Sequence, residues 1–281
     1  MKLLALVVGA GGQLGEAMAT QFAARHTVVS RTRDELDLAD ASTVHDTVAA
    51  ICPDIIVNCA AYTNVDGAEG DPQQAFATNA WAVRMLAREA RRVDAILVHY
   101  STDFVFDGRA DRPYVETDAP NPRSAYATSK LLGEWLATDA PRHYVLRVES
   151  LFGGPRARSS VDRILEGLRA GTDVRAFSDR TVSPSFVDDV VDATSSLIAG
   201  ESPYGLYHCV NSGFATWLEV ARHAAELLGK PGAPITPIKM ADVRMIAERP
   251  MFAALSNEKL AGAGVEMPTW QDALRRYVEE S

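Results

Sequence analysis

Cysteine is scarce in this chain, and the few that occur are scattered. Of the 281 residues only Cys52, Cys59 and Cys209 are cysteines, and no two of them form a CxxC pair. The six histidines also lack the spacing of metal ligands. The sequence therefore predicts no disulfide framework and no bound metal, and scattered thiols are typical of a protein in the reducing cytoplasm.

Long apolar runs and an excess of positive charge are absent as well. No stretch approaches the ~20 residues of a membrane-spanning helix, and the apolar start at residues 1–12 lacks the cleavage pattern of a secretory signal. Lysine and arginine number 28 against 37 acidic residues, a net charge of −9. We therefore expect neither a membrane nor a nucleic acid as partner, although backbone amides and a few arginines still allow local phosphate binding.

Strand-like and helix-like segments alternate through the first half of the chain. Apolar runs typical of parallel strands occupy residues 3–8, 27–30, 54–61, 96–100 and 144–148. The alternation predicts an α/β fold with a Rossmann-type doubly wound parallel sheet in residues 1–150. Residues 151–281 are less regular. We expect a smaller C-terminal substrate-binding lobe there, with a segment at about 178–212 returning to the sheet.

Local signals make further predictions about single elements. Trp81 has helical spacing within a predicted helix over residues 78–92 and is expected in the core. Asn79, at the start of that helix, is expected either to cap it or to line the site. The proline and glycine content of residues 230–237 predicts a linker.

A glycine-rich turn joins the first strand to the first helix. Gly9, Gly12 and Gly15 give the spacing G-x-x-G-x-x-G, and Gln13 and Leu14 open the helix. Such glycines permit a tight turn and bring the backbone close to a pyrophosphate, whose charge the helix amino terminus then faces. A plain turn is the alternative, but the strand before and the helix after favour a dinucleotide site.

The end of the second strand bears on the choice of dinucleotide. A free ribose 2′-hydroxyl usually meets an acidic residue there, whereas a 2′-phosphate prefers arginine. Arg31 and Arg33 favour NADP(H), and Arg31 is the better candidate. Because Asp34 and Glu35 follow closely, NADH is kept as an alternative.

Residues after the second strand and at the end of the third strand complete the expected dinucleotide site. Asp37 and Leu38 are placed to contact the adenine, although Asp37 is also a candidate cap for the following helix, a role that Asp40 suits better. Ala60 and Ala61 end the strand over residues 54–61, and their small side chains leave room for a ribose and a nicotinamide ring.

A tyrosine and a lysine one helical turn apart carry the expected proton chemistry. Tyr126 and Lys130 lie on one face of a predicted helix. A nearby ammonium lowers the pKa of a phenol, so that the pair can donate a proton to a carbonyl oxygen. The hydroxyl of Ser101 or Thr102, at the end of a strand, is placed to hold the same oxygen. Tyr-x-x-x-Lys alone is a common pattern, and its weight comes from the features upstream.

Together and in this order, these features resemble the extended short-chain dehydrogenase/reductases, and within them the dTDP-4-dehydrorhamnose reductase family. The stretches that carry the likeness are residues 57–66, 100–108 and 126–130, with weaker matches further on at residues 205–208, 216–217, 249–250 and 268–270. The likeness therefore covers almost the whole chain.

The resemblance implies NAD(P)H-dependent reduction of the 4-keto group of a nucleotide-linked 6-deoxy sugar, such as dTDP-4-dehydro-L-rhamnose to dTDP-L-rhamnose or a close relative. Tyr126 would donate the proton, Lys130 would bind the nicotinamide ribose and tune Tyr126, Thr102 would polarise the carbonyl, and Asp103 would touch the sugar. The implied cofactor, NADPH, would further contact Gly12, Gln13, Leu14, Arg31, Asp37, Leu38, Ala61, Tyr62, Thr63 and Tyr100. A monomer and a homodimer are both expected alternatives.

Two departures from the family pattern stand out. Where the family usually carries Arg-Thr-Ser-Trp, with the tryptophan packing on the sugar, this chain has the sequence from Arg147 to Ser150. Ser150 is therefore a candidate substrate contact without that platform, and Glu149 is new. A glutamate that holds magnesium in some members has Ala17 at its position, with Glu16 one place early, so no metal is carried over.

Two other functions suit the same fold. One is a non-catalytic NADP-binding regulatory subunit, like that of methionine adenosyltransferase, which need not keep Thr102, Tyr126 and Lys130. The other is a sugar-nucleotide epimerase, which would retain its cofactor through the cycle. A dehydratase is disfavoured, because dehydratases commonly show Asp-Glu where this chain has Thr102 and Asp103.

Overall fold

The computed structural model describes residues 2–156 and 159–280. Its centre is a six-stranded sheet of order β10-β5-β4-β3-β1-β2, with every pairing parallel. The strands are β1 (Leu4–Val8), β2 (Thr27–Arg31), β3 (Ile55–Asn58), β4 (Ile96–Thr102), β5 (His143–Val148) and β10 (Gly205–His208). The predicted doubly wound parallel sheet is therefore confirmed, and the strand order reverses between β1 and β3.

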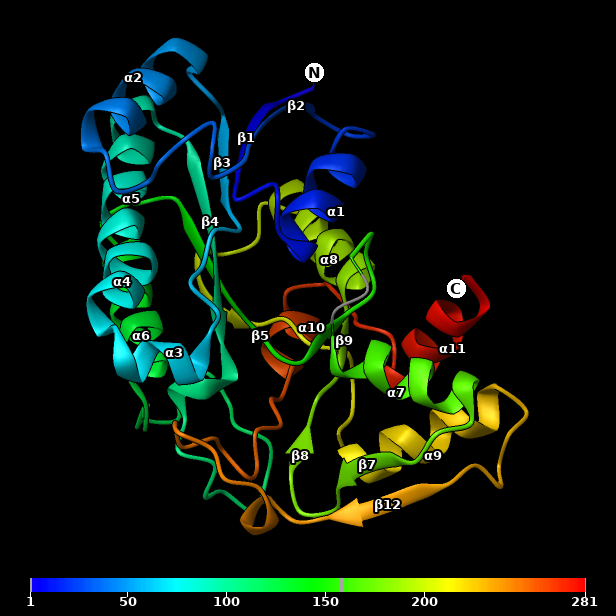
Figure 1. Ribbon diagram of the computed structural model, residues 1–281. Coiled ribbons are helices and arrows are strands. Elements are labelled where there is room, and N and C mark those ends of the chain that lie inside the picture. Colours follow the sequence, from blue (N-terminus) through cyan, green and yellow to red (C-terminus); the bar gives the residue numbers. More distant parts are fainter. Residues whose placement is uncertain (1, 157–158, 281) are drawn as a thin grey trace.

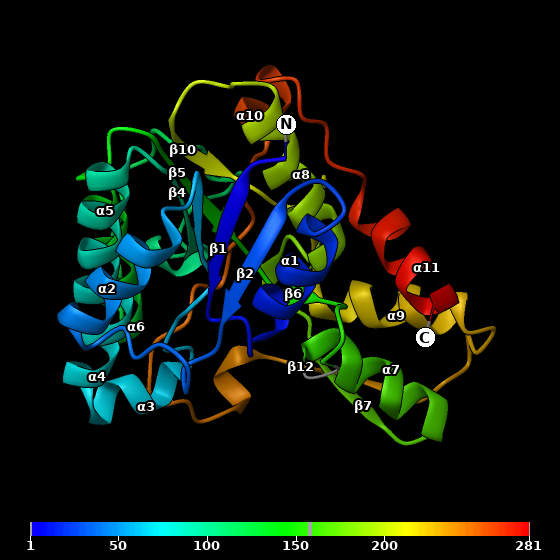
Figure 2. The same cartoon turned by 90° about the horizontal axis from the view of Figure 1, so that it is seen from above.

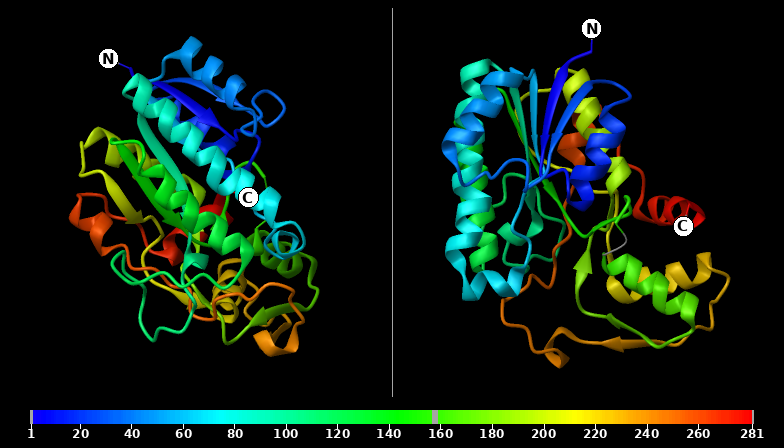
Figure 3. Two further views of the ribbon diagram at one scale, coloured as in Figure 1. Left: turned by 90° about the vertical axis from the view of Figure 1, so that its left-hand side faces the viewer. Right: turned by 45° about the horizontal axis from the view of Figure 1, so that its top comes forward.

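Helices cover both faces of this sheet, so that it forms the middle of three layers (Figures 1 and 3). One outer layer holds α2 (Ala41–Ile51), α5 (Ala82–Val93) and α6 (Ala125–Ala137); the other holds α1 (Gln13–Phe22) and α8 (Val187–Ala199). Successive side chains of β1 point to opposite faces of the sheet, and each face has its own apolar core. Ala5 and Val7 pack with α1 and α8, whereas Leu6 and Val8 pack with α2 and α5.

The connection between β3 and α5 contains the main local departure from prediction. It runs through α3 (Val65–Gly70), α4 (Pro72–Phe76) and a π-helical turn, η1 (Ala77–Trp81), before α5 begins. Trp81 was expected in the core, but this is wrong because its side chain is 50% exposed. A π-turn holds one more residue than an α-turn and rotates the following side chains, so regular helical spacing misplaces it.

A lobe built from the second half of the chain lies against one end of the sheet (Figures 1 and 2). Helices α7, α9 and α11 share its apolar core. Its elements are β6 (Leu151–Phe152), α7 (Ser160–Ala170), β7 (Val174–Phe177), β8 (Thr181–Val182), β9 (Ser185–Phe186), β11 (Ala215–Thr216), α9 (Trp217–Leu227), β12 (Ile235–Ile238) and α11 (Trp270–Glu280). Because β12 pairs with β7, the predicted linker over residues 230–237 is only partly correct.

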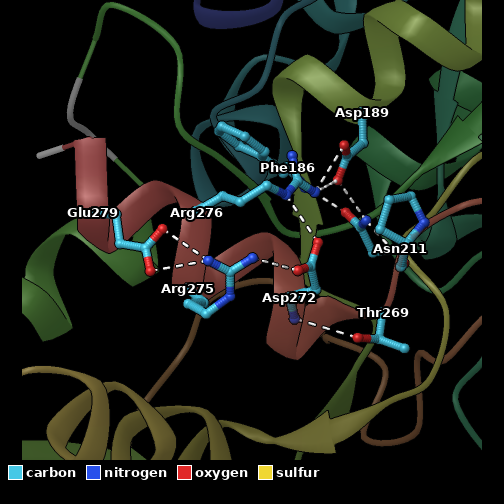
Figure 4. Close-up of polar contacts among 9 residues, drawn as sticks. Phe186, Asp189, Asn211, Thr269, Asp272, Arg275, Arg276 and Glu279 are labelled. Atoms are coloured by element: carbon cyan, nitrogen blue, oxygen red, sulfur yellow. Dashed lines mark hydrogen bonds and ion pairs between the residues drawn. The ribbon is translucent and has the colours of Figure 1, made fainter.

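The chain moves between sheet and lobe several times. After β9 it returns to the sheet as α8 and β10, and after β12 it returns again through η3 (Met240–Asp242) to α10 (Glu258–Gly262), which packs on β10. Figure 4 shows how the last helix is fixed to this arrangement. Arg276 on α11 pairs with Asp189 on α8 at 2.7 Å, and Asn211 bridges Asp189 to the backbone of Phe186.

No described helix combines the length and the apolar character that crossing a membrane would require.

Candidate active site

Two loops meet closely at the carboxyl edge of the sheet, where the strand order reverses. Gly9 has φ +74°, and a Cβ there would lie 2.5 Å from the backbone nitrogen of Ala60, in the loop after β3. A Cβ on Gly15 would lie 2.2 Å from the carbonyl oxygen of Gly9. Only glycine fits at either position. Ligands of open α/β sheets bind at this crevice, so the glycine pattern lies where a dinucleotide site requires it.

The amino terminus of α1 is open toward the same edge. Gly12 precedes the helix and supplies no side-chain cap. The Gln13 side chain turns away and donates to the carbonyl of Gly153 at 2.8 Å, while Leu14 and Gly15 are buried. Free backbone N–H groups at a helix start favour an anion. The residues present therefore fit the pyrophosphate of a dinucleotide, and their contacts with one stay a prediction.

The residues predicted to hold the adenosine part lie beyond β2. Arg31 ends that strand, and its side chain is only partly buried. Asp37 accepts from the backbone of Ala39 at 3.0 Å, and Leu38 packs on the core under α2. As predicted, Asp40 rather than Asp37 caps α2, accepting from the backbone of Ser42 at 2.9 Å. The structure leaves the predicted adenine contacts of Asp37 and Leu38 as predictions.

The loop after β3 is held in place by hydrogen bonds from Asn79. This residue is fully buried in η1, and its amide accepts from the backbone N–H of Tyr62 at 2.8 Å and donates to Tyr62 O and to Ser129 Oγ, both at 3.0 Å. Asn79 is thus neither a helix cap nor an exposed lining residue. It clamps the loop that carries Ala61, Tyr62 and Thr63 to helix α6.

Helix α6 brings the predicted tyrosine and lysine to the end of β4. Ser124 caps the helix, and Lys130 Nζ donates to the carbonyl oxygen of Tyr100 at 2.5 Å. Burial lowers the pKa of Lys130 to about 8, against the opposing charge of Glu134. The Tyr100 hydroxyl itself bonds to Thr194 on α8 at 2.7 Å, so this predicted cofactor residue offers its backbone rather than its phenol to the site.

The Tyr126 phenol lies against the Thr102 hydroxyl, and its proton is held firmly. Burial raises the pKa of Tyr126, hydrogen bonding to Thr102 opposes this, and the charge of Asp103 adds to it. The predicted lowering by Lys130 is not found, because burial dominates and the ammonium is directed at Tyr100. The phenol is therefore protonated at neutral pH, which suits a proton donor.

The two candidate hydroxyls on β4 are now separated. Successive residues of a strand point to opposite sides, and Ser101 Oγ donates to Glu134 Oε1 at 2.5 Å. Glu134 also forms a buried ion pair with Arg147 at 2.7 Å. Ser101 is therefore committed to that pair, and Thr102, which donates to Asp103 Oδ1 at 2.9 Å, is the hydroxyl beside Tyr126.

A group of charged side chains lies next to Thr102, and motif spacing did not predict it. Asp103, after the end of β4, and Glu149, after the end of β5, are buried, whereas Arg180, before the start of β8, is only partly buried. Burial raises the pKa of Asp103 to about 6 against the cation of Arg180, and burial with the charge of Asp103 raises the pKa of Glu149 well above its usual range. From the sequence, Asp103 was expected to touch the sugar and Glu149 departed from the family pattern, but nothing indicated that the two side chains lie close together.

Ser150 and a neighbouring cavity complete the surroundings. Ser150 takes φ +45°, and its carbonyl accepts from Ser185 N at 3.4 Å. Beyond Arg180 lies a cavity of about 370 Å³ between α7, β7 and Trp217, and its lining also includes Arg163 and Arg175. The lining also contains the carboxylate of Asp173, so three arginines stand against one acidic residue, and this excess of positive charge favours an anionic group.

Comparisons with known proteins identify the family of this chain. The family model described as RmlD substrate binding domain matches residues 1–281. A dTDP-4-dehydrorhamnose reductase of Burkholderia thailandensis is 34% identical over 98% of each chain. A probable dTDP-4,6-dihydroxy-2-methyloxan-3-one 4-ketoreductase of Streptomyces antibioticus is 36% identical over 96% of this chain and 92% of its own.

A solved structure of the dTDP-4-dehydrorhamnose reductase of Bacillus anthracis, in complex with NADP, superposes with a TM-score of 0.94 at 29% identity and covers 100% of both chains. The match of both sequence and structure along the full length shows that this chain belongs to the dTDP-4-dehydrorhamnose reductase family.

Proposed function

We propose that this protein is an NADPH-dependent reductase of a nucleotide-linked 4-keto-6-deoxy sugar, of the kind that converts dTDP-4-dehydro-L-rhamnose to dTDP-L-rhamnose. The observation that supports this most directly is the protonated phenol of Tyr126, which lies beside the Thr102 hydroxyl at the same sheet edge as the glycine turn. NADPH bound at that edge supplies the hydride for the carbonyl carbon. The chain itself then has to hold the carbonyl oxygen and protonate it.

The side chains divide this work among themselves. Thr102 Oγ1 turns from Asp103 to donate to the carbonyl oxygen, and Tyr126 delivers its proton to the same atom as negative charge develops there. Lys130 is charged at neutral pH, since its pKa of about 8 lies above it. Its ammonium donates to Tyr100 O and is positioned there to reach a nicotinamide ribose.

The lobe supports the substrate part of the proposal. Arg163, Arg175 and Arg180 are among the residues that line the 370 Å³ cavity, and the Arg180 cation also acts on the pKa of Asp103. A sugar nucleotide would place its diphosphate near these arginines and its keto carbon at Tyr126. Within this proposal the lobe from residue 151 onward binds substrate, and Arg31 favours NADPH over NADH through the 2′-phosphate.

The test is Tyr126→Phe. Because a positioned general acid contributes about 10²–10⁴-fold, we expect NADPH oxidation with dTDP-4-dehydro-L-rhamnose to fall by at least about a hundredfold while NADPH affinity is unchanged. Tyr204→Phe, at a half-exposed tyrosine outside the site, is the matched control. Turnover by Tyr126→Phe at the unmodified rate would refute the mechanism.

The same assay separates the competing functions. A regulatory subunit would bind NADPH and oxidise none of it with any ketosugar. An epimerase would retain tightly bound oxidised cofactor through purification and interconvert sugars without net oxidation of added NADPH.

A further inference from the structure

Three polar atoms beside the proposed reaction centre are buried without a hydrogen-bond partner among the described residues. They are Asp103 Oδ2, Glu149 Oε1 and Arg180 Nε. Asp103 and Glu149 are only 3% and 1% exposed. Leaving such groups unpaired is costly. Two carboxyl groups and a guanidinium that are unsatisfied in the same electrostatic neighbourhood therefore point to a polar group of a ligand.

The other contacts of these carboxyls define what each free atom can do. Glu149 Oε2 accepts from the backbone N–H of Ser183 at 2.7 Å, so a proton on this carboxyl belongs on Oε1. Asp103 Oδ1 accepts from Thr102, which leaves Oδ2 as an acceptor. Since burial and the charge of Asp103 keep Glu149 protonated, the pair presents one donor and one acceptor. A hydroxyl group, which both donates and accepts, matches this arrangement.

Sequence adjacency places the pair relative to the reacting carbonyl. Asp103 directly follows Thr102, and Thr102 holds the carbonyl oxygen in the proposed mechanism. Asp103 Oδ1 lies 2.9 Å from Thr102 Oγ1, so the Asp103 carboxyl is close enough to the carbonyl to contact a substituent on one of the two carbons beside it. Of these two carbons only C3 carries a hydroxyl, because C5 carries the ring oxygen and the methyl group.

We propose that Glu149, with Asp103 and Arg180, binds the C3 hydroxyl of the ketosugar and makes the enzyme selective for substrates that carry it. This inference rests on the proposed reductase function and names its substrate class. Glu149 acts here as a specificity-determining residue. At the position of the family's serine this chain has Glu149, which supplies a polar contact. At the position of the family's tryptophan it has Ser150, which supplies no platform for the sugar.

The test measures binding, so that it does not depend on turnover. dTDP-L-rhamnose and its 3-deoxy analogue are titrated into the protein with NADP present, using calorimetry. Because loss of the hydroxyl leaves buried groups unpaired, the analogue should bind the unmodified protein at least about tenfold more weakly. Glu149→Ser should bind both ligands within about twofold of each other, and Glu149→Gln, whose amide still donates, should keep most of the preference.

Controls separate recognition from folding. Glu266→Ser, at an exposed glutamate in a loop, should leave the preference intact, and NADP affinity should be equal in all variants. Should Glu149→Ser fail to fold, the ratio in Glu149→Gln and the preference of the unmodified protein still decide. An unmodified protein that binds both ligands equally, or a Glu149→Ser variant with the full preference, would overturn the proposal. Binding without turnover would overturn the reductase function alone.

Discussion

At the scale of single residues, burial rather than charge pairing sets the protonation of the site. It raises the pKa of Tyr126 and Glu149, and it lowers that of Lys130. Motif spacing predicted Tyr126 and Lys130, which lie one helical turn apart, and left Ser101 and Thr102 as alternatives at the end of a strand; the family resemblance selected Thr102. Motif spacing could not predict that Glu149 and Arg180 lie near Asp103, because the three residues flank different strands and their proximity depends on how the lobe packs against the sheet.

The buried ammonium of Lys130 has a stability cost that a substitution should reveal. Its pKa falls from 10.5 to about 8 on folding. Below pH 8 the folded protein therefore carries the full cost of burying the ammonium. Between about pH 8 and 10.5 the free energy of unfolding rises, because Lys130 is deprotonated in the folded state but still protonated in the unfolded state. At pH 7 the free energy of unfolding of Lys130→Met should be roughly 2 kcal/mol higher than that of the unmodified protein. This difference should shrink toward pH 10.

Urea unfolding of both proteins at several pH values measures this difference. Other titrating groups are common to both proteins and cancel in the comparison. A difference that is constant from pH 7 to 10 would contradict the assignment. Activity should be lost throughout, in keeping with a residue retained for function.

At the scale of elements, the contact of α6 with η1 positions the catalytic helix. Gly133 on α6 lies against the backbone of Asn79, where a Cβ would be 2.1 Å from the Asn79 carbonyl oxygen. The sequence predicted both helices but not this approach, since hydrophobic spacing does not register a π-turn. The same turn explains why Trp81 is exposed.

Gly133→Ala should therefore disturb both stability and catalysis. Forcing a methyl group into a packed backbone contact costs about 1–3 kcal/mol, and a shift of α6 away from η1 would change the position of Tyr126 relative to Thr102. We expect a lower melting temperature and a reduced kcat. Gly262→Ala, in α10 with no atom within 4 Å of a Cβ, is the matched control and should be neutral or slightly stabilising. Equal behaviour of the two variants would argue against this role of α6.

At the scale of the whole molecule, the segment over residues 244–256 joins the lobe, at Thr181, to the loops after β3 and β4, at Asp66 and Gly108; in Figure 1 it is the dark orange trace that runs from the lower edge up to α10. Asp66 at the start of α3 accepts from both Arg249 and Ala247 at 2.9 Å. A Cβ on Gly108 would lie 2.5 Å from Pro250. The sequence offered Arg249 and Pro250 only as a family match, because their partners are far away along the chain.

Removing the Asp66 charge should loosen this segment without unfolding the protein. We expect Asp66→Asn to accelerate hydrogen exchange of the Ala247 amide and to raise KM for the sugar nucleotide, while NADPH affinity stays the same. Asp46→Asn, on the exposed face of α2, is the control. Unchanged exchange at Ala247 would show that other contacts hold the segment.

The repeated passage of the chain between sheet and lobe limits how such an enzyme can diverge. No single break in the polypeptide frees the lobe, since α8, β10 and α10 return to the sheet between its parts. A new lobe therefore cannot be acquired by one recombination event, as it can when domains follow one another along a gene. New substrates have to be reached by point substitutions where sheet and lobe meet, and Glu149, which follows β5 and accepts from Ser183 of the lobe, stands at such a position.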